Sequence, residues 1–388
     1  MEVERPSTLR SFGSLLEAGA APLETEHGVF AAHLFRNLST RRPTLVLTRG
    51  DVGAPEPLLA RVHSACVTSE SLAGCDCDCA AQLDAALARI ASEGRGALFY
   101  LLQEGRGAGL AAKARDRMIV QSSDHRITTF EAYDLMGLGR DLRRYEEVAF
   151  AYQLLRIAAP LRLLTNNPEK RAAIEASGIA VQETLSLRGS ACAESAHYLA
   201  SKSRTGHALD DPGDCAAALP QPLHYFDPQP LSDPPGVVHL AAYWLPVRVP
   251  DRPEAHWFRL ELFDGPAGER IVLERPAHGA GPVPLRFERC DLLDRVRRGG
   301  RARWQQAAAA LIECGPGLVA FEPGRFEREP GAEPDRLTAA LLARALGERR
   351  ARLVIDGPGE SPFDRACARE LTRQGVRLEA PLDLATRP

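Results

Sequence analysis

Four cysteines gather within fourteen residues of this chain, at positions 66, 75, 77 and 79. Cys66, Cys77 and Cys79 form a C-x10-C-x-C pattern. A catalytic zinc ion takes three protein ligands and leaves the fourth position to water, whose pKa the ion lowers toward neutrality. Buried structural cysteines are the alternative, but the aspartates interleaved with this cluster make it a poor core pattern. The spacing therefore predicts a zinc site with one open position.

Cys75 introduces a second interpretation of the same cluster. A fourth thiolate would close the zinc coordination and make the site structural. If residues 75–79 were extended, Cys75 and Cys79 would lie about 13 Å apart at roughly 3.3 Å per residue. Both could then reach one ion only through a tight bend. We expect the open three-cysteine site, with the closed four-cysteine site as the alternative.

Three further segments carry groups that suit an anionic ligand. Gln103–Gly107 is a glycine-containing loop after an apolar run, where Arg106 can make a forked contact with phosphate. Thr165–Lys170 opens a helix, and helix-start N–H groups beside a lysine suit an anion. Asp141–Tyr145 begins another helix. An ordinary glycine turn or N-cap explains each of them nearly as well, so none is specific alone.

The elements that must position these groups alternate along the chain as in an α/β or α+β protein. In the first half, the predicted strands are 43–50, 58–67, 96–102, 161–167 and 178–187, with helices at 80–92 and 145–157 among them. In the second half, the predicted strands are 257–263, 270–274, 283–288, 317–322 and 352–355.

A proline-rich segment separates the two halves. Residues 208–236 hold seven prolines in 29 positions, and no helical or strand period survives there. We therefore predict a first domain at 1–207, a linker at 208–236 and a second domain at 237–388.

The second half also echoes the first. Residues 80–100 and 303–321 share the order helix, glycine turn and apolar strand, and residues 161–183 and 351–380 share strand, turn, helix and strand. The echoes keep their order at an offset near 220 residues, which shrinks to about 190 after a deletion in the second copy. Any two αβ units look alike, which is the alternative, but we favour a degenerate internal duplication.

Composition narrows the class of protein. The chain has 388 residues, 45% hydrophobic and 26% charged, which is typical of a globular protein. No apolar run approaches the ~20 residues that cross a bilayer, and no signal-peptide pattern begins the chain. The net charge of -3 provides no broad field for nucleic acid. We expect a soluble cytoplasmic protein without a membrane or nucleic-acid partner.

Taken together, the motifs resemble those of GTP cyclohydrolase II, the zinc enzyme that opens riboflavin biosynthesis. The resemblance covers roughly residues 22–208 and includes all three lysines of the chain. The matching stretches, in order, are Arg61-Val62-His63-Ser64-x-Cys66-x-Thr68, Cys77-Asp78-Cys79, Gln82-Leu83, Glu93-Gly94-Arg95-Gly96, Gln103-Glu104-Gly105-Arg106-x-x-Gly109-Leu110-x-x-Lys113, Asp141-x-Arg143, Leu163-Leu164-Thr165-Asn166-Asn167-Pro168-x-Lys170, and His197-Tyr198-Leu199 with Lys202 and Gly206-His207.

The resemblance implies a layered αβα domain with a mixed sheet, followed by a degenerate copy. It implies that Cys66, Cys77 and Cys79 hold zinc, whose hydroxide attacks C8 of the guanine ring, and that Gln82 reads the guanine edge. Asp141 is implied as the acid/base group, and Arg143 as the group acting at the α-phosphate. The residues implied to hold the nucleotide and its triphosphate, with Mg²⁺ on the phosphates, are Arg61, Glu104, Gly105, Arg106, Thr165 and Lys170.

The chain also departs from the family pattern. Ala65, Asp76 and Leu102 stand where the family has an acid, an arginine and an arginine. Arg117 stands where the family has its active-site tyrosine, and residues 118–130 lose the family signature. A guanidinium cannot act as a base at neutral pH, but on its flexible stem it is free to contact phosphate. We therefore count Arg117 among the catalytic-site residues and expect a changed balance of products.

The second half departs further, and we expect a catalytically inactive copy. It offers Cys290 alone at the position of the metal loop, and Ile355-Asp356-Gly357-Pro358 replaces the lysine-containing turn. It supports the first half, either as an intramolecular pseudo-dimer or within a homodimer.

The leading hypothesis is a zinc-dependent cyclohydrolase that opens the imidazole ring of GTP or a close purine nucleotide. The product is either a formamidopyrimidine or, with formate and pyrophosphate released, a diaminopyrimidine. The alternative is a non-catalytic nucleotide-binding or regulatory protein with a structural zinc.

Overall fold

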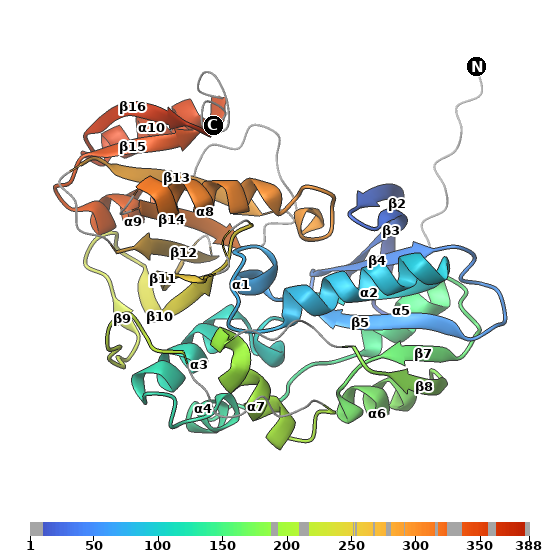
Figure 1. Ribbon diagram of the computed structural model, residues 1–388. Coiled ribbons are helices and arrows are strands. Elements are labelled where there is room, and N and C mark those ends of the chain that lie inside the picture. The colour runs from blue at the N-terminus through green and yellow to red at the C-terminus, as the bar shows by residue number, and fades with distance from the viewer. Residues whose placement is uncertain are drawn as a thin grey trace, which may run out of the picture.

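Two eight-stranded mixed sheets with flanking helices make up the protein (Figure 1). The computed structural model describes residues 11–187, 193–208, 217–250, 252, 254–266, 268–276, 281–290, 292–314, 317–323, 336–355 and 362–384. None of the helices in these ranges is long and apolar enough to cross a membrane.

The first sheet has the strand order β1-β2-β3-β4-β6-β5-β7-β8. Its first five strands are antiparallel neighbours, whereas β6, β5, β7 and β8 run parallel. The strands are β1 (Ser11–Phe12), β2 (Leu15–Thr25), β3 (Gly28–Asn37), β4 (Pro43–Arg49), β5 (Leu58–Ser64), β6 (Gly96–Leu101), β7 (Leu161–Leu164) and β8 (Val181–Leu185).

Helices cover both faces of this sheet, which gives the layered αβα arrangement. Strand residues alternate between the faces. On β6, Leu98 and Tyr100 pack toward α2 (Cys79–Glu93), whereas Ala97 and Phe99 pack toward α5 (Glu146–Leu154) and α6 (Pro168–Ala176). The central parallel strands β5 and β6 are buried along nearly their whole length, as expected for strands covered on both faces.

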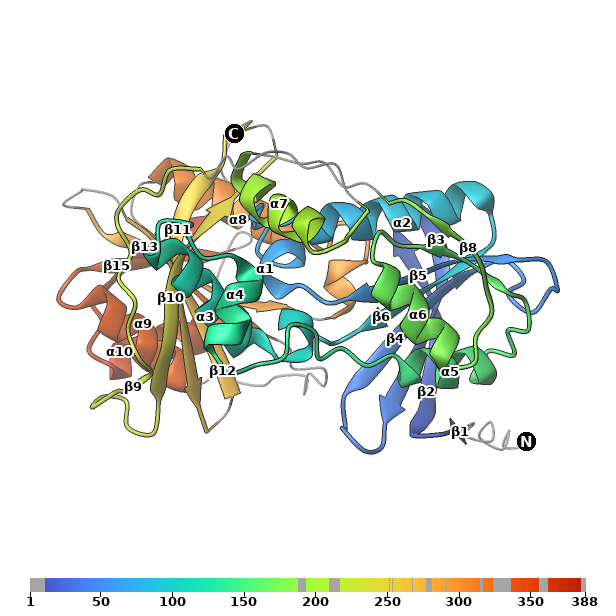
Figure 2. The ribbon, with the colours of Figure 1, turned by 90° about the horizontal axis from the view of Figure 1, so that it is seen from below.

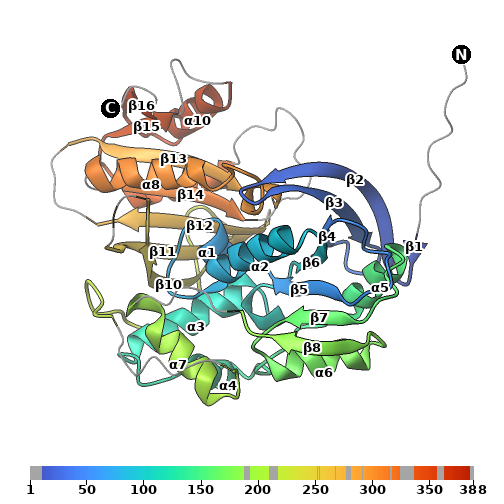
Figure 3. The same ribbon diagram turned by 45° about the vertical axis from the view of Figure 1, so that its right-hand side comes forward.

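Shorter elements gather beside the second sheet. They include α1 (Val67–Glu70), the 3-10 turn η1 (Gly105–Gly107), α3 (Leu110–Ser122), α4 (Thr129–Leu135) and α7 (Ala196–Arg204), with the 3-10 turn η2 (Ala193–Ser195) ahead of α7. In Figure 3, α1 and α3 lie between the two sheets. Of the site residues expected from the sequence, these elements carry Gly105, Arg106 and Arg117.

The second sheet repeats the first, strand by strand. Its order is β9-β10-β11-β12-β14-β13-β15-β16, with the same succession of antiparallel and parallel neighbours. The strands are β9 (Gln229–Pro230), β10 (Val238–Val247), β11 (His256–Gly265), β12 (Gly268–Arg275), β13 (Val283–Cys290), β14 (Gly317–Pro323), β15 (Ala351–Ile355) and β16 (Leu378–Asp383). Its helical elements are η3 (Leu293–Arg295), α8 (Ala302–Cys314), α9 (Arg336–Leu346) and α10 (Pro362–Arg373).

The registers of the two sheets are equivalent as well. Leu58 pairs with Leu161 in the first sheet, and Val283 pairs with Ala351 in the second. These equivalent residues lie 225 positions apart on β5 and β13, and 190 apart on β7 and β15. The expectation of an α/β fold followed by a second copy of similar fold is therefore confirmed.

The copies differ most between their sixth and seventh strands in chain order. Residues 102–160 of the first half hold η1, α3, α4 and α5, whereas the corresponding connection of the second half, 324–350, is less than half as long. In its described part this connection contains α9. The second half thus has no room for a full counterpart of the η1–α4 segment.

The two halves bury apolar residues against each other. Helix α3 lies on β10, where Leu110, Ala114 and Met118 pack in one core with Tyr243 and Leu245 (Figure 2). In the opposite direction, Leu292 and Val296 beside η3 enter the core that α2 forms on the first sheet. Each half therefore completes part of the other's core.

Candidate active site

A cavity of about 120 Å³ opens where β5, β6 and β7 end, under η1, α3, α4 and α7. Most of the residues expected at the site line it: Arg61, Cys66, Cys79, Gln82, Glu104, Gly105, Arg106, Arg117, Arg143, Thr165 and Lys170. Two expected residues, Cys77 and Asp141, lie behind this lining. The parallel strands bring these groups together because their carboxyl ends meet at one edge of the sheet.

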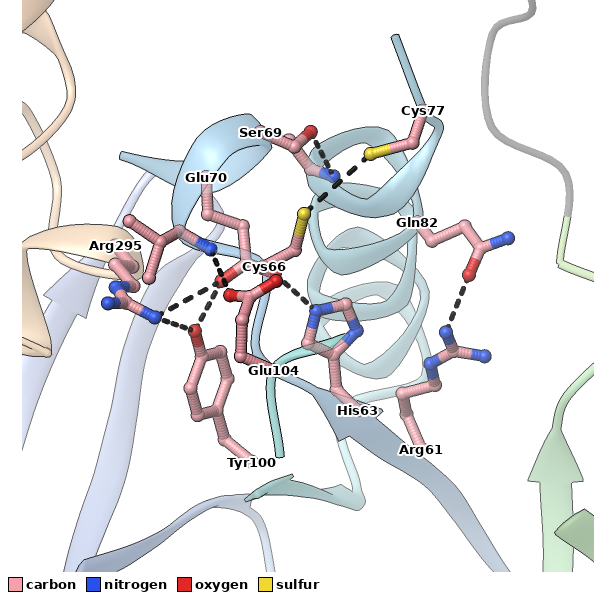
Figure 4. Close-up of polar contacts among 12 residues, drawn as sticks. Arg61, His63, Cys66, Ser69, Glu70, Cys77, Gln82, Tyr100, Glu104 and Arg295 are labelled. Carbon is pink, nitrogen blue, oxygen red and sulfur yellow. Dashed lines mark hydrogen bonds and ion pairs between the residues drawn. The ribbon is translucent and has the colours of Figure 1, made fainter. Parts of the chain in front are cut away.

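Three sulfur atoms form a compact cluster in the wall of the cavity. The ligand atoms of Cys66, Cys77 and Cys79 all lie within 4.8 Å of one another. The sulfurs of Cys66 and Cys77, drawn in Figure 4, are 3.7 Å apart. Two thiolates bound tetrahedrally to zinc at about 2.3 Å lie about 3.8 Å apart, so this spacing and donor set fit the ion. Cys75 is not part of the cluster, and its backbone N–H donates to Pro246 O across the interface at 2.9 Å.

Lys113 connects α3 to the cysteine cluster. Its Nζ lies 2.9 Å from Cys66 Sγ, 2.8 Å from Thr68 Oγ1 and 2.9 Å from Glu104 Oε1. Burial opposes the ammonium charge, but Cys66 and Glu104 outweigh it and hold the pKa of Lys113 well above its usual value. The second carboxylate oxygen of Glu104 accepts the N–H of Val67 at 2.6 Å. The Lys113 ammonium is therefore buried between a sulfur of the cluster and a carboxylate.

A buried polar network supports α1 from below the cluster (Figure 4). Glu70 is essentially inaccessible, with Oε1 2.7 Å from His63 Nε2 and Oε2 accepting the Tyr100 hydroxyl proton. Arg295 of the second half donates to the Tyr100 hydroxyl at 3.0 Å and lies 4.0 Å from Glu70. The helix that begins after Cys66 is thus anchored from both halves.

Cations from several elements line the cavity. Lys170 donates to Val62 O at 2.9 Å, and burial, followed by Arg61 and Arg143, holds the pKa of its ammonium well below the usual value. Burial likewise lowers the pKa of Arg61 to about 10. Cations held this close together are relieved by a multiply charged anion, which is the electrostatic signature of a polyphosphate site.

Gln82 lies among these groups with its amide already engaged. Its Oε1 accepts from Arg61 Nη2 at 2.7 Å, and its Nε2 donates to Asp78 Oδ2 at 2.6 Å. Arg61 also donates to Leu164 O at 2.9 Å. Asp78 in turn pairs with Lys202 at 2.8 Å. This series of hydrogen bonds fixes the orientation of the Gln82 amide at the cavity wall.

Asp141 has a different environment from the one expected for an acid/base group. Both of its carboxylate oxygens accept from the Arg143 guanidinium, with Nε to Oδ1 at 2.8 Å. Burial opposes this charge, but the hydrogen bonds from Arg143 lower the pKa of Asp141 below its usual value. An ionised carboxylate held in this way is a poor proton donor at neutral pH, and its geometry is that of a group orienting Arg143.

Arg117 also differs from the expectation of a cation free to contact phosphate. Its Nε donates to Asp76 Oδ2 at 2.8 Å, and its Nη1 donates to Thr129 Oγ1 at 3.1 Å. The guanidinium lies over the Tyr198 ring, 4.6 Å from the centroid. The buried ion pair with Asp76 restrains the Arg117 guanidinium. Asp76 and Arg117, which both depart from the family pattern, are therefore in direct contact.

The second half holds the site elements in place. Gln121 on α3 makes two hydrogen bonds of 2.7 Å with the backbone of Trp244 on β10. The backbone N–H of Ala111, at the start of α3, donates to Glu269 at 3.1 Å. Gly74, just before Cys75, forms an isolated β-bridge with Val247. The metal loop, which is the cysteine-containing segment 66–79, and helix α3 are therefore both fixed against β10 and its neighbours.

The equivalent place in the second half has different chemistry. Arg286 occupies the position of Arg61 and makes the equivalent contact, with Nη1 3.5 Å from Val354 O. Glu288 replaces His63 and forms a buried ion pair with Arg286. Among the described residues, the one candidate metal cluster is that of the first half. The side chain of Cys290 and residues 356–358 lie outside the described residues.

Sequence reasoning gave no role to several residues that line the cavity. Asp116, Thr129 and Tyr133 face it from α3 and α4, and Tyr198 and Lys202 face it from α7. Asp116 carried a usable signal, because it lies three residues after Lys113 and a helix brings such positions to one face. Thr129 and Tyr133 carried none, since the departure of residues 118–130 from the family pattern removed the guide to their placement.

Comparison with known proteins gives a matching family model and several relatives that cover about half of this chain. Residues 17–186 match the family model described as GTP cyclohydrolase II. A GTP cyclohydrolase-2 of Teredinibacter turnerae is 40% identical over 192 residues, covering 49% of this chain and 94% of that protein. That of Tolumonas auensis is 42% identical over 193 residues, covering 50% and 96%. A riboflavin biosynthesis protein RibBA of Bacillus mycoides is 39% identical over 189 residues, covering 48% of this chain and 47% of that protein.

Proposed function

The chain belongs to the GTP cyclohydrolase II family, and from that premise we propose that it is a hydrolase that opens the imidazole ring of GTP or a close purine nucleotide. One observation carries the proposal most strongly. The three-sulfur cluster lies in the wall of a cavity that is also lined by several buried cations. A metal site and a polyphosphate site therefore share one cavity, which suits an attack on the base of a bound nucleoside triphosphate.

Cys66, Cys77 and Cys79 are the proposed zinc ligands. Zinc held there would supply the Lewis acidity that makes water nucleophilic at neutral pH. Lys113 donates to the Cys66 sulfur, and Glu104 holds both Lys113 and the backbone of Val67. These contacts fix the ligand positions before substrate arrives, which is how preorganised sites lower a barrier.

The triphosphate is proposed to bind among Arg61, Arg106, Arg143 and Lys170, with Thr165 and Gly105 beside them and Mg²⁺ sharing the phosphate charge. Arg106 has a φ of +54° and packs over the Phe130 ring, 4.0 Å from its centroid, which holds its guanidinium at the cavity. Asp141 orients Arg143 toward the phosphates. Gln82, held by Arg61, is proposed to contact the guanine edge.

We propose that catalysis belongs to residues 1–207 and that residues 237–388 act as a built-in partner, joined by the linker at 208–236. The equivalent strand order, the reciprocal packing of α3 and η3, and the contacts of β10 with the metal loop support this role. A second half of this kind replaces the partner subunit of a symmetric dimer with an intramolecular pseudo-dimer.

For the products, we propose that ring opening outruns removal of the formyl group, so that a formamidopyrimidine nucleotide accumulates. The support is Arg117, a permanent cation fixed to Asp76 where the family carries a phenol that can relay a proton.

The direct test is to incubate the purified, zinc-loaded protein with GTP and to follow ultraviolet absorbance, formate and pyrophosphate. Loss of the purine spectrum supports the proposed function, and the ratio of formate to consumed GTP identifies the product. An unchanged purine spectrum, together with tight GTP binding, would instead favour a non-catalytic nucleotide-binding protein with a structural zinc.

A further inference from the structure

Asp116 is a buried carboxyl group that has no role in the proposed function described above. It lies on α3, its side chain is 3% exposed, and it lines the cavity. Its Oδ1 has no hydrogen-bond partner among the described residues. Burying a carboxyl oxygen without a partner is costly, so this atom is expected to have a function.

The position of Asp116 relates it directly to the sulfur cluster. Lys113, whose Nζ is 2.9 Å from Cys66 Sγ, precedes it by three residues on α3. Residues three apart on a helix share a face and are displaced by about 4.5 Å along the axis. Asp116 therefore lies one helical turn from the residue that contacts a proposed zinc ligand, on the wall of the same cavity.

The groups around Asp116 come from four elements. On α3 these are Lys113 and Arg117, the latter with Nη1 3.6 Å from Asp116 Oδ2. Arg106 of η1 adds a positive charge, and α4 contributes the Thr129 hydroxyl and the Tyr133 phenol. On β10, the Tyr243 hydroxyl is buried behind α3. Burial outweighs the nearby cations and raises the pKa of Asp116 to about 6.

The other carboxyl groups near the site are less available. Both oxygens of Asp141 are held by Arg143, and those of Glu104 by Lys113 and the Val67 N–H. Asp78 pairs with Lys202 and Gln82, and Asp76 pairs with Arg117. Asp116 thus differs from Asp141, Glu104 and Asp78 in having a carboxyl oxygen without a hydrogen-bond partner among the described residues. It differs from Asp76, whose Oδ1 is also unpaired, in lining the cavity.

We propose that Asp116 is the general acid that protonates the ring nitrogen released when the purine opens. This inference rests on the proposed function and names the proton donor within it. The water oxygen bonds to C8, the C8–N9 bond breaks, and its electron pair stays on N9, which takes the proton of the Asp116 carboxyl. The two hydrogen atoms of the water end on N7 and on Asp116, which is thereby returned to its acid form.

The test replaces Asp116 with asparagine, which keeps the shape of the side chain but cannot donate as an acid. Asp116→Asn is expected to lower kcat for ring opening by about 10²- to 10⁴-fold, the usual contribution of a positioned general acid. KM for GTP is expected to stay within about threefold, because the donor acts in the transition state. Asp116→Glu should recover part of the lost rate. Asp134→Asn, on the exposed side of α4, is the matched control and should keep the full rate.

Two further measurements distinguish an acid from a structural residue. Infrared difference spectra of the zinc-loaded protein labelled with ¹³C-aspartate should show a carboxyl group that titrates near pH 6, and Asp116→Asn should abolish that signal. The ring-opening rate of the unmodified protein should fall as rising pH deprotonates the donor, and this alkaline limb should be missing in Asp116→Asn. Zinc content and melting temperature of the variant should match those of the parent.

The outcomes separate this inference from the function it depends on. If the unmodified protein leaves the purine ring intact, the proposed function fails, and the inference fails with it. If the unmodified protein opens the ring and Asp116→Asn does so at the same rate and pH dependence, the inference alone is wrong. In a third outcome, Asp116→Asn loses zinc or stability together with activity, and Asp116→Glu recovers neither the zinc or stability nor the activity. That result would assign Asp116 a structural role and would also overturn the inference.

Discussion

Glu70 and Arg295 occupy equivalent positions in the two halves and face each other across the interface. They lie 225 residues apart in sequence, at the ends of α1 and η3, and their charged groups approach to 4.0 Å. Both side chains are at least 97% buried. Two identical halves packed in this way would place like charges together, either two carboxylates or two guanidinium groups. The interface is therefore built for two unlike halves.

Removing the positive partner should destabilise the protein strongly. Arg295→Met keeps the apolar stem but leaves Glu70 buried without its counter-charge, and breaking a buried pair costs about 3–5 kcal/mol. Denaturant unfolding followed by far-ultraviolet circular dichroism measures this loss. Arg298→Met is the control, because Arg298 pairs with Glu24 in a largely exposed position and should change little. Equal stability of Arg295→Met and the parent would show that Glu70 does not depend on Arg295.

The sequence predicted much of the parallel part of each sheet. Buried parallel strands form continuous apolar runs, and β6, β13, β14 and β15 begin and end within two residues of the predicted bounds. The run at 58–67 was predicted too long, since β5 ends at Ser64 and Cys66 precedes the short helix α1. The β2–β3 hairpin was not predicted, because the middle of β2 is exposed and consists of small residues without alternation.

The candidate site was predicted in its composition but not in its pairings. The family motifs predicted that the cysteines, Arg106 and Lys170 belong to one site, and in the structure these residues lie at one cavity. The Asp76–Arg117 ion pair spans 41 positions, so no local pattern could show it. Helix α3 was not predicted from the sequence, for a related reason. Its buried face includes Lys113, Asp116 and Arg117, which are polar residues that weaken the apolar period expected of a packed helix.

Metal binding should distinguish the cysteines of the cluster from their neighbour. Cys77→Ser removes one of the three clustered sulfurs and is expected to lose both zinc and ring-opening activity. Cys75→Ser should keep most of both, because its backbone N–H, not its sulfur, makes the contact with Pro246. Metal content per chain, measured by plasma mass spectrometry, tests this. Equal loss of zinc in the two variants would support a closed four-cysteine site.

Nucleotide affinity should depend on the phosphates far more than on the base. Guanosine lacks the triphosphate, and each charge-assisted contact contributes about 1.5–3 kcal/mol, so it should bind much more weakly than GTP. Lys170→Ala and Arg106→Ala should each weaken GTP binding but leave guanosine binding nearly unchanged. Calorimetry on the zinc-loaded protein gives both affinities. Similar affinities for the nucleoside and the nucleotide would contradict the assignment of the cationic wall to the triphosphate.

The product ratio should respond to Asp76 and Arg117 together. Arg117→Tyr alone restores the family phenol but leaves the buried Asp76 carboxylate without its partner, which destabilises the metal loop. Asp76→Arg combined with Arg117→Tyr removes that carboxylate and restores both family residues. We expect the double variant to release more formate per GTP consumed than the parent, because a phenol can relay the proton that a guanidinium cannot. Asp76→Asn is the control and should leave the formate yield low. One equivalent of formate per GTP from the unmodified protein would show that another group already performs this step, and the substitution at Arg117 would then carry no consequence for the product.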